Sequence, residues 1–205
     1  MLPLGQHDEY RCGVTPQTKA QWRQITLAAR DAVSEHTRNT ETAALITHIR
    51  SVIVDGSVVC AYVPTRTEPG STDLLDAVAE IAQRVLLPIT GEPGPLSWVE
   101  YSGADGLRPA KYGIREPVGP VLPPETLSDV ECMLVPALAV DLRGTRLGRG
   151  AGFYDRTLGS VGPQTRLVAI VRDSELVEAL PADDHDIPMG WALTPSGGLT
   201  PLQGD

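Results

Sequence analysis

The chain has 205 residues, and 41% of them are hydrophobic, which is enough for a buried core and indicates a globular domain rather than a disordered chain. The formal net charge of −9 disfavours a protein that wraps nucleic acid, because phosphate binding requires a basic face. Only two of the seventeen cationic residues are lysines, Lys19 and Lys111. The places where this sparse positive charge gathers are therefore informative.

The three cysteines, Cys12, Cys60 and Cys132, form no CxxC pair and cannot build a full disulfide framework, which favours a reduced compartment. The first residues lack the basic patch and apolar core of a signal peptide. Apolar runs fall well short of the roughly 18–20 residues that span a bilayer. We therefore expect a cytoplasmic protein without a membrane partner, with a loose leader at residues 1–14 and one domain at 15–205.

Helices and strands are predicted to alternate along the chain. Thr15-Pro16 is typical of a helix start, and the helical spacing of Trp22, Ile25 and Ala29 predicts a helix to about His36. Later apolar runs predict helices over 38–50 and 72–84 and strands over 57–63, 85–89, 96–101, 132–140, 166–171 and 190–194. This alternation predicts an α/β fold with a largely parallel sheet.

The most informative stretch is DLRGTRLGRGAGFYDRTL, residues 141–158. Gly148, Gly150 and Gly152 follow a predicted buried strand and precede a short helix, so several backbone N–H groups can point at one anion. The pattern is not a P-loop, because no Gly-Lys-Ser/Thr follows, and it is not the dinucleotide fingerprint, because position 153 is not glycine. Taken alone, three alternating glycines also fit a surface turn.

Charge favours the anion-binding interpretation of this loop. Residues 143–156 carry four arginines and one acid, a local net charge of +3 in an acidic chain, and arginine suits bidentate contact with phosphate. On the first predicted helix, Lys19, Arg23 and Arg30 fall within roughly 40° of one another at about 100° per residue. This basic stripe is either a solvated face or one side of a cleft.

Three further side chains are candidates for chemistry. Asp155 closes the glycine loop and Asp186 ends the run ADDHD; two such carboxylates suit Mg²⁺, although ADDHD is also typical of a solvated acidic turn. Glu68 follows the predicted strand 57–63, at the kind of edge where open α/β sheets bind ligands, but a lone loop glutamate is often simply exposed. Phe153, the only phenylalanine, lies inside the glycine loop, which favours a stacking or pocket-lining role.

VPALAVDLRGTRLGRGAGFYDR, residues 135–156, closely resembles the signature of the 5-formyltetrahydrofolate cyclo-ligases, also called 5,10-methenyltetrahydrofolate synthetases. The resemblance extends over nearly all of the chain from Thr18 onward. Its matching elements, in order, are the helix with Lys19, Arg23 and Arg30 and its Val33-Ser34 end, the Glu68 loop with Ser71-Thr72, GIREP (113–117) and ALPADDHD (179–186). The chain departs from the family pattern at Ala137, Val140, Phe153 and Glu175, which bears on the folate-side contacts and on substrate choice.

The resemblance implies a three-layer α/β fold, a largely parallel sheet flanked by helices, shared with sugar-phosphate isomerase and CoA-transferase domains. It also implies ATP-dependent cyclisation of 5-formyltetrahydrofolate to 5,10-methenyltetrahydrofolate with Mg²⁺, releasing ADP and phosphate, by a monomer whose partners are small molecules. In the family scheme the formyl oxygen takes the γ-phosphoryl group of ATP, N10 attacks the activated carbon, and phosphate leaves. The alternatives are a catalytically silent folate- or nucleotide-binding relative with a regulatory role and a different ATP-using enzyme.

The resemblance assigns site residues in three groups. The ATP-binding group is Lys19, Arg23, Arg146, Leu147, Gly148, Arg149, Gly150, Ala151, Gly152, Phe153 and Tyr154. The folate-binding group is Val63, Glu68, Arg149, Gly150, Ala151, Gly152 and Phe153. The metal ligands are Asp155 and Asp186.

Overall fold

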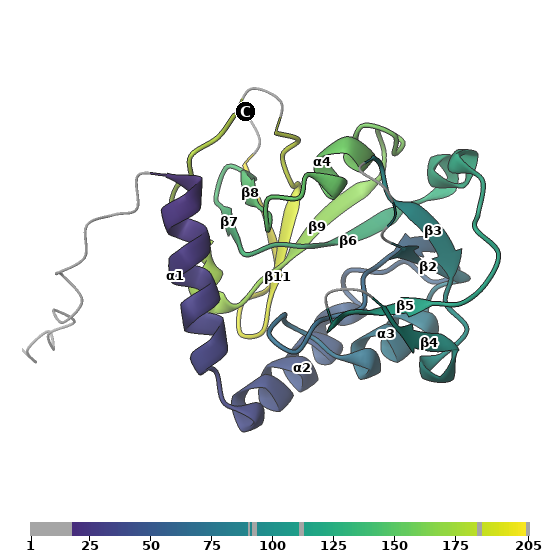
Figure 1. The fold of residues 1–205 in the computed structure, drawn as a ribbon, viewed down its shortest axis with the longest axis horizontal. Coiled ribbons are helices and arrows are strands. Elements are labelled where there is room, and N and C mark those ends of the chain that lie inside the picture. Colours follow the sequence, from purple (N-terminus) through teal and green to yellow (C-terminus); the bar gives the residue numbers. More distant parts are fainter. Residues whose placement is uncertain (1–17, 90, 92–93, 111–112, 184–185, 204–205) are drawn as a thin grey trace, which may run out of the picture.

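The computed structural model describes residues 18–89, 91, 94–110, 113–183 and 186–203 (Figure 1). The helices are α1 (Lys19–Ala32), α2 (Glu35–Ile49), α3 (Thr72–Ala79) and α4 (Phe153–Leu158), with 3₁₀ turns η1 (Ala104–Gly106), η3 (Pro124–Asp129) and η4 (Asp173–Glu175). The strands of the main sheet are β1 (Val58–Cys60), β2 (Arg84–Ile89), β3 (Ser97–Glu100), β6 (Cys132–Pro136), β9 (Arg166–Ile170), β11 (Trp191–Thr194) and β12 (Gly198–Pro201). The remaining strands are β4 (Leu107–Pro109), β5 (Arg115–Pro117), β7 (Ala139–Asp141), β8 (Arg146–Leu147) and β10 (Leu176–Val177).

The main sheet has seven strands in the order β12-β11-β9-β6-β1-β2-β3. Its five inner strands are parallel, and β3 and β12 run antiparallel at the edges. Strands β10, β7 and β8 form a small second sheet, and β4 pairs with β5. The predicted α/β class with a largely parallel sheet is confirmed.

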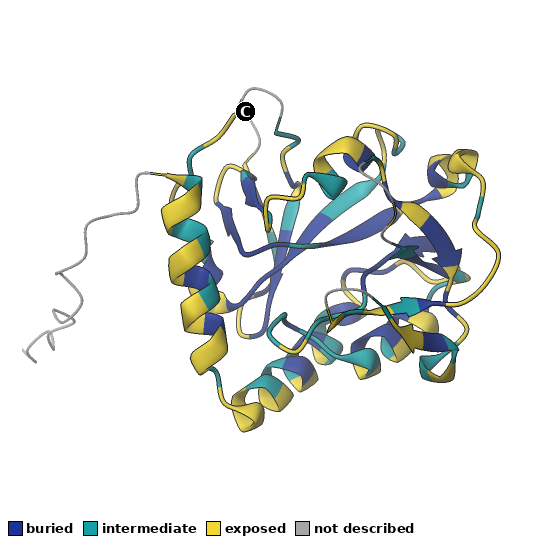
Figure 2. Cartoon of the chain, viewed as in Figure 1, coloured by how far each residue is buried: buried dark blue, intermediate teal, exposed yellow. Residues whose placement is uncertain are grey.

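Two hydrophobic clusters cover the two faces of the main sheet. Leu45 of α2 and Leu74 of α3 belong to one cluster, and Leu127 of η3 and Leu158 of α4 belong to the other. Because successive side chains of a strand point to opposite faces, neighbouring strand residues divide between the two clusters. Figure 2 shows the sheet as the buried centre of the molecule, with exposed positions on the outer sides of the helices. The result is the expected three-layer arrangement.

The two predicted helices are present, but the predicted end of the first at about His36 is too late, because the chain turns between α1 and α2 at Val33 and Ser34. Val33 is extended, and the Ser34 side chain accepts a hydrogen bond from the Thr37 N–H at 3.1 Å, which caps α2. At the other end, Thr18 caps α1 in a capping box with Gln21. The predicted start at Thr15-Pro16 lies outside the described residues. In the described part of the chain, no helix is long and apolar enough to cross a membrane.

The apolar stripe expected on the first helix does not face the core as a whole. Trp22 and Leu27 pack against Leu147 beneath the small sheet, but Ile25 is 53% exposed. The buried positions of α1 are instead polar: Thr26 and Arg30. The helix is therefore held in large part by hydrogen bonds and ion pairs rather than by an apolar face.

The predicted strand over 132–140 is two strands that belong to different sheets. β6 ends at Pro136 in the main sheet, and β7 begins at Ala139 in the small one. The break exposes backbone groups at the end of β6, where the Ala137 carbonyl accepts a hydrogen bond from Arg30. The two- to four-residue strands β4, β5, β8, β10 and β12 were not predicted, because they are too short for a periodic pattern.

Candidate functional site

A cavity of about 220 Å³ lies where the order of the main sheet reverses. From β1 the chain continues to β2 on one side, and β6 later joins β1 on the other side. Tyr62 and Val63, which follow β1, line the cavity together with Pro136 and Ala137 at the end of β6. Open parallel sheets bind ligands outside the carboxyl ends of their strands at such a switch point. The fold therefore places the cavity at the edge where a ligand is expected.

The glycine loop between β8 and α4 forms one wall of this cavity. Gly150 and Gly152 have φ values of +98° and +70°, a left-handed conformation that other residues adopt only with strain. Gly152 is also the N-cap residue of α4. The glycine spacing thus serves a sharply folded backbone at the cavity wall, which explains why larger residues do not stand at these two positions.

Asp141 organises the turn that leads into the glycine loop. Its buried carboxylate accepts hydrogen bonds from the N–H groups of Arg143 at 3.0 Å, Thr145 at 2.8 Å and Leu180 at 2.9 Å. These bonds join the β7–β8 turn to the segment after β10. The sequence analysis did not assign a role to Asp141, although an aspartate beside a glycine-containing turn is a common turn-forming signal.

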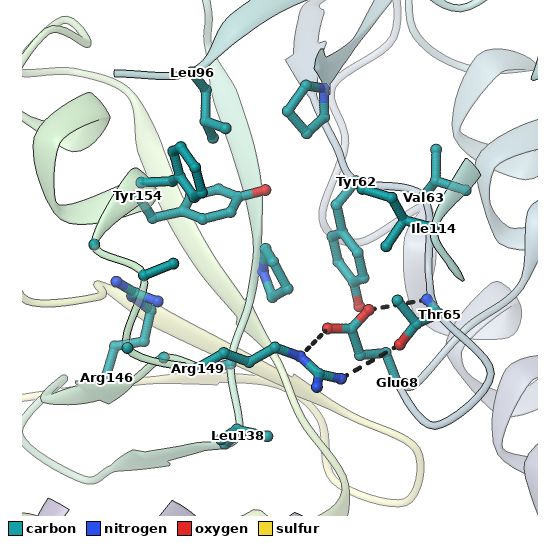
Figure 3. A pocket seen from close by; sticks show the side chains of 18 of the residues that line it. Tyr62, Val63, Thr65, Glu68, Leu96, Ile114, Leu138, Arg146, Arg149 and Tyr154 are labelled. Carbon is teal, nitrogen blue, oxygen red and sulfur yellow. Dashed lines mark hydrogen bonds and ion pairs between the residues drawn. The ribbon is translucent and has the colours of Figure 1, made fainter. Parts of the chain in front are cut away.

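Glu68 stands on the opposite wall, in the loop that follows β1. Its carboxylate accepts hydrogen bonds from the Thr65 N–H at 2.9 Å and from Arg149 Nε, in the glycine loop, at 3.2 Å (Figure 3). Arg149 also donates to Thr65 Oγ1 at 3.4 Å. Arg149 and Glu68 therefore join the two walls, and a ligand placed between them has to replace this contact with its own.

The Tyr154 hydroxyl points into the cavity, as Figure 3 shows, and has no hydrogen-bond partner among the described residues. Burial raises the pKa of Tyr154, and so do the nearby Glu68 and Cys60, so the hydroxyl stays protonated and can donate. Tyr62 differs, because its hydroxyl donates to the Pro69 carbonyl at 3.0 Å. The Arg146 guanidinium lies 5.7 Å from the centre of the Tyr154 ring. Apolar lining on the other sides comes from Val63, Leu96, Ile114 and Leu138.

Each carboxylate of the predicted metal pair contacts a cation from the predicted ATP-binding group. Arg146 Nη2 donates to Asp155 Oδ1 at the cavity wall. Lys19 Nζ donates to Asp186 Oδ2 at 2.7 Å and to Asp183 Oδ2 at 2.8 Å. Burial lowers the pKa of Lys19, but the two carboxylates outweigh it and the pKa is raised, so the ammonium stays charged.

Arg23 braces the glycine loop from outside the cavity. Its Nε donates to the Gly148 carbonyl at 3.0 Å. A side-chain carbon at Gly150 would lie 3.5 Å from the Arg23 guanidinium, so the loop backbone runs close to it. Lys19 and Arg23 therefore contact the outer side of the site rather than the cavity lining itself.

The donor atoms suit Mg²⁺ if a nucleotide completes the coordination. Mg²⁺ is usually bound by one or two carboxylates together with phosphate oxygens and water. Asp155, with a side chain 41% exposed, and Asp186 supply such oxygens. Among the described residues, no three His, Cys, Asp or Glu side chains lie close enough to hold a metal by themselves. The residues fit a metal shared with a polyphosphate rather than an all-protein metal site.

Residues 15–195 match the family described as the 5-formyltetrahydrofolate cyclo-ligase family. The chain belongs to this family. A 5-formyltetrahydrofolate cyclo-ligase of Mycolicibacterium smegmatis is 45% identical over 195 residues, which are 93% of this chain and 100% of the relative. The enzyme of that name from Escherichia coli K12 is 33% identical over 150 residues, 70% of this chain and 81% of the relative.

Solved structures agree with the cyclo-ligase assignment. The NMR structure of Aquifex aeolicus 5,10-methenyltetrahydrofolate synthetase has a TM-score of 0.74 at 30% identity and covers 91% of this chain and 94% of that one. A 5,10-methenyltetrahydrofolate synthetase from Mycoplasma pneumoniae has a TM-score of 0.67 at 17% identity, covering 85% and 96%, and supports the fold alone.

The structure gathers most, but not all, of the predicted residues of this cyclo-ligase at the cavity. The predicted residues that line it are Val63, Glu68, Arg146, Gly148, Arg149, Gly150, Ala151, Gly152, Phe153, Tyr154 and Asp155. Leu147 is buried behind the loop, against Trp22 and Leu27. The lining residues that sequence analysis missed include Tyr62, Thr65, Ile114 and Arg30. Arg30 had a signal, its place in the basic stripe with Lys19 and Arg23, whereas nothing in the sequence distinguishes Tyr62, Thr65 and Ile114 from other loop residues.

The four departures from the family pattern divide into two kinds. Ala137 and Phe153 line the cavity, so they can affect contacts with a substrate. Val140 is fully buried in the core, and Glu175 is buried in a polar network below the cavity. The latter two therefore act on packing and positioning rather than by touching a ligand.

Proposed function

We propose that this cyclo-ligase family member converts 5-formyltetrahydrofolate to 5,10-methenyltetrahydrofolate in an ATP-dependent cyclisation that releases ADP and phosphate. The observation that carries the proposal is a cavity whose opposite walls offer two complementary chemistries. One wall presents the Glu68 carboxylate, and the other presents the glycine loop with Arg146 and Arg149. The 45% identity over the whole length of a relative that bears the enzyme's name supports it.

The reaction needs an activated formyl group, because a formamide carbon is a poor electrophile. Transfer of the γ-phosphoryl group to the formyl oxygen makes that oxygen a leaving group. N10 then attacks the formyl carbon, its proton is lost, and phosphate leaves with the former formyl oxygen. Catalysis of such a sequence consists mainly of positioning the reactants and neutralising charge. The residues of the site are suited to these two tasks.

The glycine loop is proposed to hold the phosphates of ATP. The left-handed turns at Gly150 and Gly152 lie at the start of α4, where backbone N–H groups are available to an anion. Arg146 and Arg149 add positive charge from the same wall. Lys19 and Arg23 add charge from the outer side of the loop, where the second and third guanidinium nitrogens of Arg23 have no partner among the described residues.

Glu68 is proposed to accept hydrogen bonds from the pterin ring, between the side chains of Val63 and Phe153. In the structure its carboxylate is satisfied by Thr65 and Arg149. A nucleotide that draws Arg149 toward its phosphates would free one carboxylate oxygen for the pterin. Because ATP would free a Glu68 oxygen that the pterin can use, binding of either ligand would strengthen binding of the other. The free Tyr154 hydroxyl adds a donor between the two ligands.

Asp155 and Asp186 are proposed to hold Mg²⁺ together with the nucleotide. The metal, when bound, neutralises negative charge that builds up on the transferred phosphoryl group. The two carboxylates are paired with Arg146 and Lys19, so these cations become available to phosphate oxygens when the carboxylates turn to a metal. We further propose that the protein acts as a monomer in the cytoplasm, with ATP and a reduced folate as its partners.

The test is turnover of the purified protein with MgATP and 5-formyltetrahydrofolate, followed by the near-ultraviolet absorbance of the methenyl product and by ADP release. We expect one ADP for each methenyl product and no product when ATP or Mg²⁺ is omitted. A folded protein that binds both ligands and forms no product would be the silent relative. ADP release that needs another small acceptor would identify a different ATP-using enzyme.

A further inference from the structure

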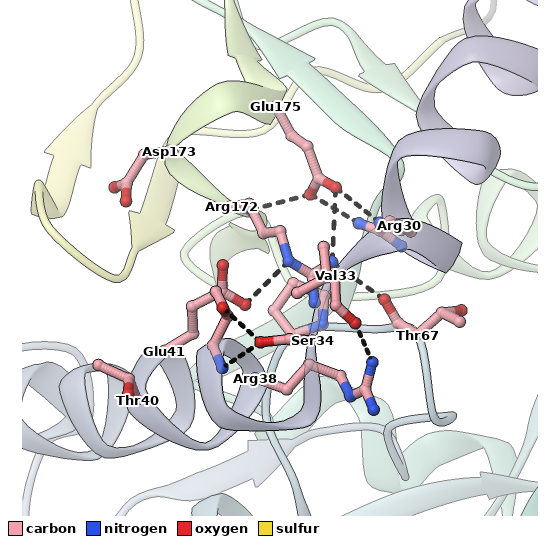
Figure 4. Close-up of polar contacts among 12 residues, drawn as sticks. Arg30, Val33, Ser34, Arg38, Thr40, Glu41, Thr67, Arg172, Asp173 and Glu175 are labelled. Carbon is pink, nitrogen blue, oxygen red and sulfur yellow. Dashed lines mark hydrogen bonds and ion pairs between the residues drawn. The ribbon is translucent and has the colours of Figure 1, made fainter.

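Arg30, in the last turn of α1, lines the cavity although its side chain is only 1% exposed. Its Nε and Nη2 donate to the two carboxylate oxygens of Glu175, each at 2.7 Å (Figure 4). Nη2 also donates to the Ala137 carbonyl at 2.6 Å. A fully buried arginine is rare unless it is paired, and this one is held in a single orientation by three hydrogen bonds.

The third nitrogen of this guanidinium, Nη1, is buried and has no hydrogen-bond partner among the described residues. An unsatisfied buried donor destabilises a protein by about 1–3 kcal/mol, and more when it is charged. Arg172 Nη2 is also unpaired, but Arg172 does not line the cavity. Arg30 therefore combines an unused donor with a position at the cavity wall.

The surroundings of Arg30 place it on the same side of the cavity as Tyr62 and Glu68. Glu175 and the Ala137 carbonyl occupy one side of the planar guanidinium, so Nη1 faces away from them. Burial lowers the pKa of Arg30, but Glu175 raises it above the ordinary value, with smaller contributions from Tyr62 and Glu68. Both of these smaller contributors line the cavity, on the wall opposite the glycine loop.

The same network also fixes the Glu68 loop. Glu175 accepts a hydrogen bond from the Arg172 N–H at 2.8 Å, and the Arg172 side chain donates to Glu41 at 2.9 Å and to the Thr67 carbonyl at 3.0 Å. Thr67 directly precedes Glu68. Two arginines and two glutamates balance in charge, and together they hold Arg30 and the Glu68 loop in a fixed relation.

We propose that Arg30 is a substrate-binding residue that donates from Nη1 to the 4-oxo group of the pterin ring, beside Glu68. The inference rests on the proposed function, and it names a residue that helps the site to distinguish one pteridine from another. One edge of the pterin presents the 2-amino group and N3–H as donors and the 4-oxo group as acceptor. A carboxylate takes the two donors, and a guanidinium takes the acceptor. A 4-amino pteridine would place a donor against Arg30, so the site rejects it.

The test measures equilibrium binding of two ligands: 5-formyltetrahydrofolate and the same compound with a 4-amino group in place of the 4-oxo group. Because removing Arg30 alone would take from the buried Glu175 the guanidinium that contacts both of its carboxylate oxygens, the variant is Arg30→Met with Glu175→Gln, compared with Glu175→Gln alone. The double change leaves Arg172 paired with Glu41. The exposed-pair variant Arg84→Met is the matched control for an arginine-to-methionine change, and thermal unfolding verifies that each variant folds.

We expect the Arg30→Met change, within the Glu175→Gln background, to weaken binding of 5-formyltetrahydrofolate by about 10- to 100-fold and to leave the 4-amino compound bound as before or more tightly. Equal weakening of both ligands would mean that Arg30 only supports the fold, and would overturn the inference. An unchanged preference for the 4-oxo ligand would overturn it as well. Binding without turnover in the wild type contradicts the proposed activity alone, whereas no binding contradicts both.

Discussion

Two clusters of charged side chains flank the cavity, and they differ in burial. The buried network consists of Arg30, Arg172, Glu175 and Glu41, whose side chains are between 1% and 17% exposed. The outer cluster joins Lys19 to Asp183 and Asp186; the Asp183 side chain is 57% exposed, whereas those of Lys19 and Asp186 are 20% and 16% exposed. The first cluster reaches the cavity through Arg30 and the Glu68 loop through Thr67, while the second contains Lys19, one helical turn before the Arg23 that contacts the glycine loop.

Because of this difference, the buried network serves as a fixed scaffold, whereas the contacts of the outer cluster can be exchanged during the reaction. Breaking a buried ion pair leaves an uncompensated charge, so its partners stay together throughout a reaction. Partly exposed pairs are held by much less energy, and their groups can change partners. Lys19 and Asp186 are suited to release one another when a phosphate and a metal arrive, whereas Arg30 and Glu175 are suited to hold a donor in place.

The largest effect on stability is expected for Arg172→Met. The change takes the Arg172 guanidinium away from Glu175, which keeps Arg30 and the backbone N–H of residue 172, and it leaves Glu41 without its pair and the Thr67 carbonyl without its donor. Urea unfolding should show a loss of about 3–5 kcal/mol in the free energy of unfolding. Arg84→Met breaks a partly exposed pair with Glu100 and should lose about 0–1 kcal/mol. Similar losses in both variants would contradict the distinction between the clusters.

In contrast to the stability loss expected for Arg172→Met, Lys19→Ala should lower activity strongly and change stability little. Loss of a cation at the phosphates should lower kcat/KM for ATP about 100-fold or more, because such clamps act mainly on developing charge. The free energy of unfolding should change by about 1 kcal/mol or less, because the pairs of Lys19 are partly exposed. Turnover within a factor of about three of wild type would exclude Lys19 from the ATP site.

The glycine loop and the parallel sheet could be predicted because their causes are local. A left-handed backbone at Gly150 and Gly152 requires glycine, and strands buried on both faces consist of continuous apolar runs such as 132–136. The glycine-loop signature also led to the family. Each of these features depends on a few consecutive residues, so a short stretch of sequence is enough to predict it.

The role of Arg30 and the exact position of the helix break after Ala32 could not be predicted in the same way. Arg30 meets Glu175, which is 145 positions away, so no window of sequence shows that this arginine is buried. Its helix has an exposed Ile25 and a buried Thr26, which reverses the usual apolar pattern. The Ser34 cap had a visible signal, since serine is a preferred N-cap residue, but the helical spacing continued across it.

Asp155→Asn tests the proposed metal site, and Asp183→Asn, in the outer cluster, is its matched control. We expect the first variant to need about 10-fold more Mg²⁺ for half-maximal turnover, because an amide oxygen is a weaker ligand than a carboxylate. Asp183 is largely exposed and contacts Lys19, so its change should alter the Mg²⁺ requirement by less than about threefold. A larger shift for Asp183 than for Asp155 would mean that the metal binds on the acidic turn.

Phe153→Tyr is expected to have the smallest effect, because Phe153 belongs to neither cluster. Its ring packs at the cavity wall, with the Arg156 guanidinium 5.5 Å from the ring centre, and tyrosine keeps both the ring and this contact. We expect kcat/KM for 5-formyltetrahydrofolate to stay within about threefold of wild type, measured beside the ATP value as an internal control. A change above about tenfold confined to the folate would show that position 153 helps to set substrate choice, which the apolar contact alone does not predict.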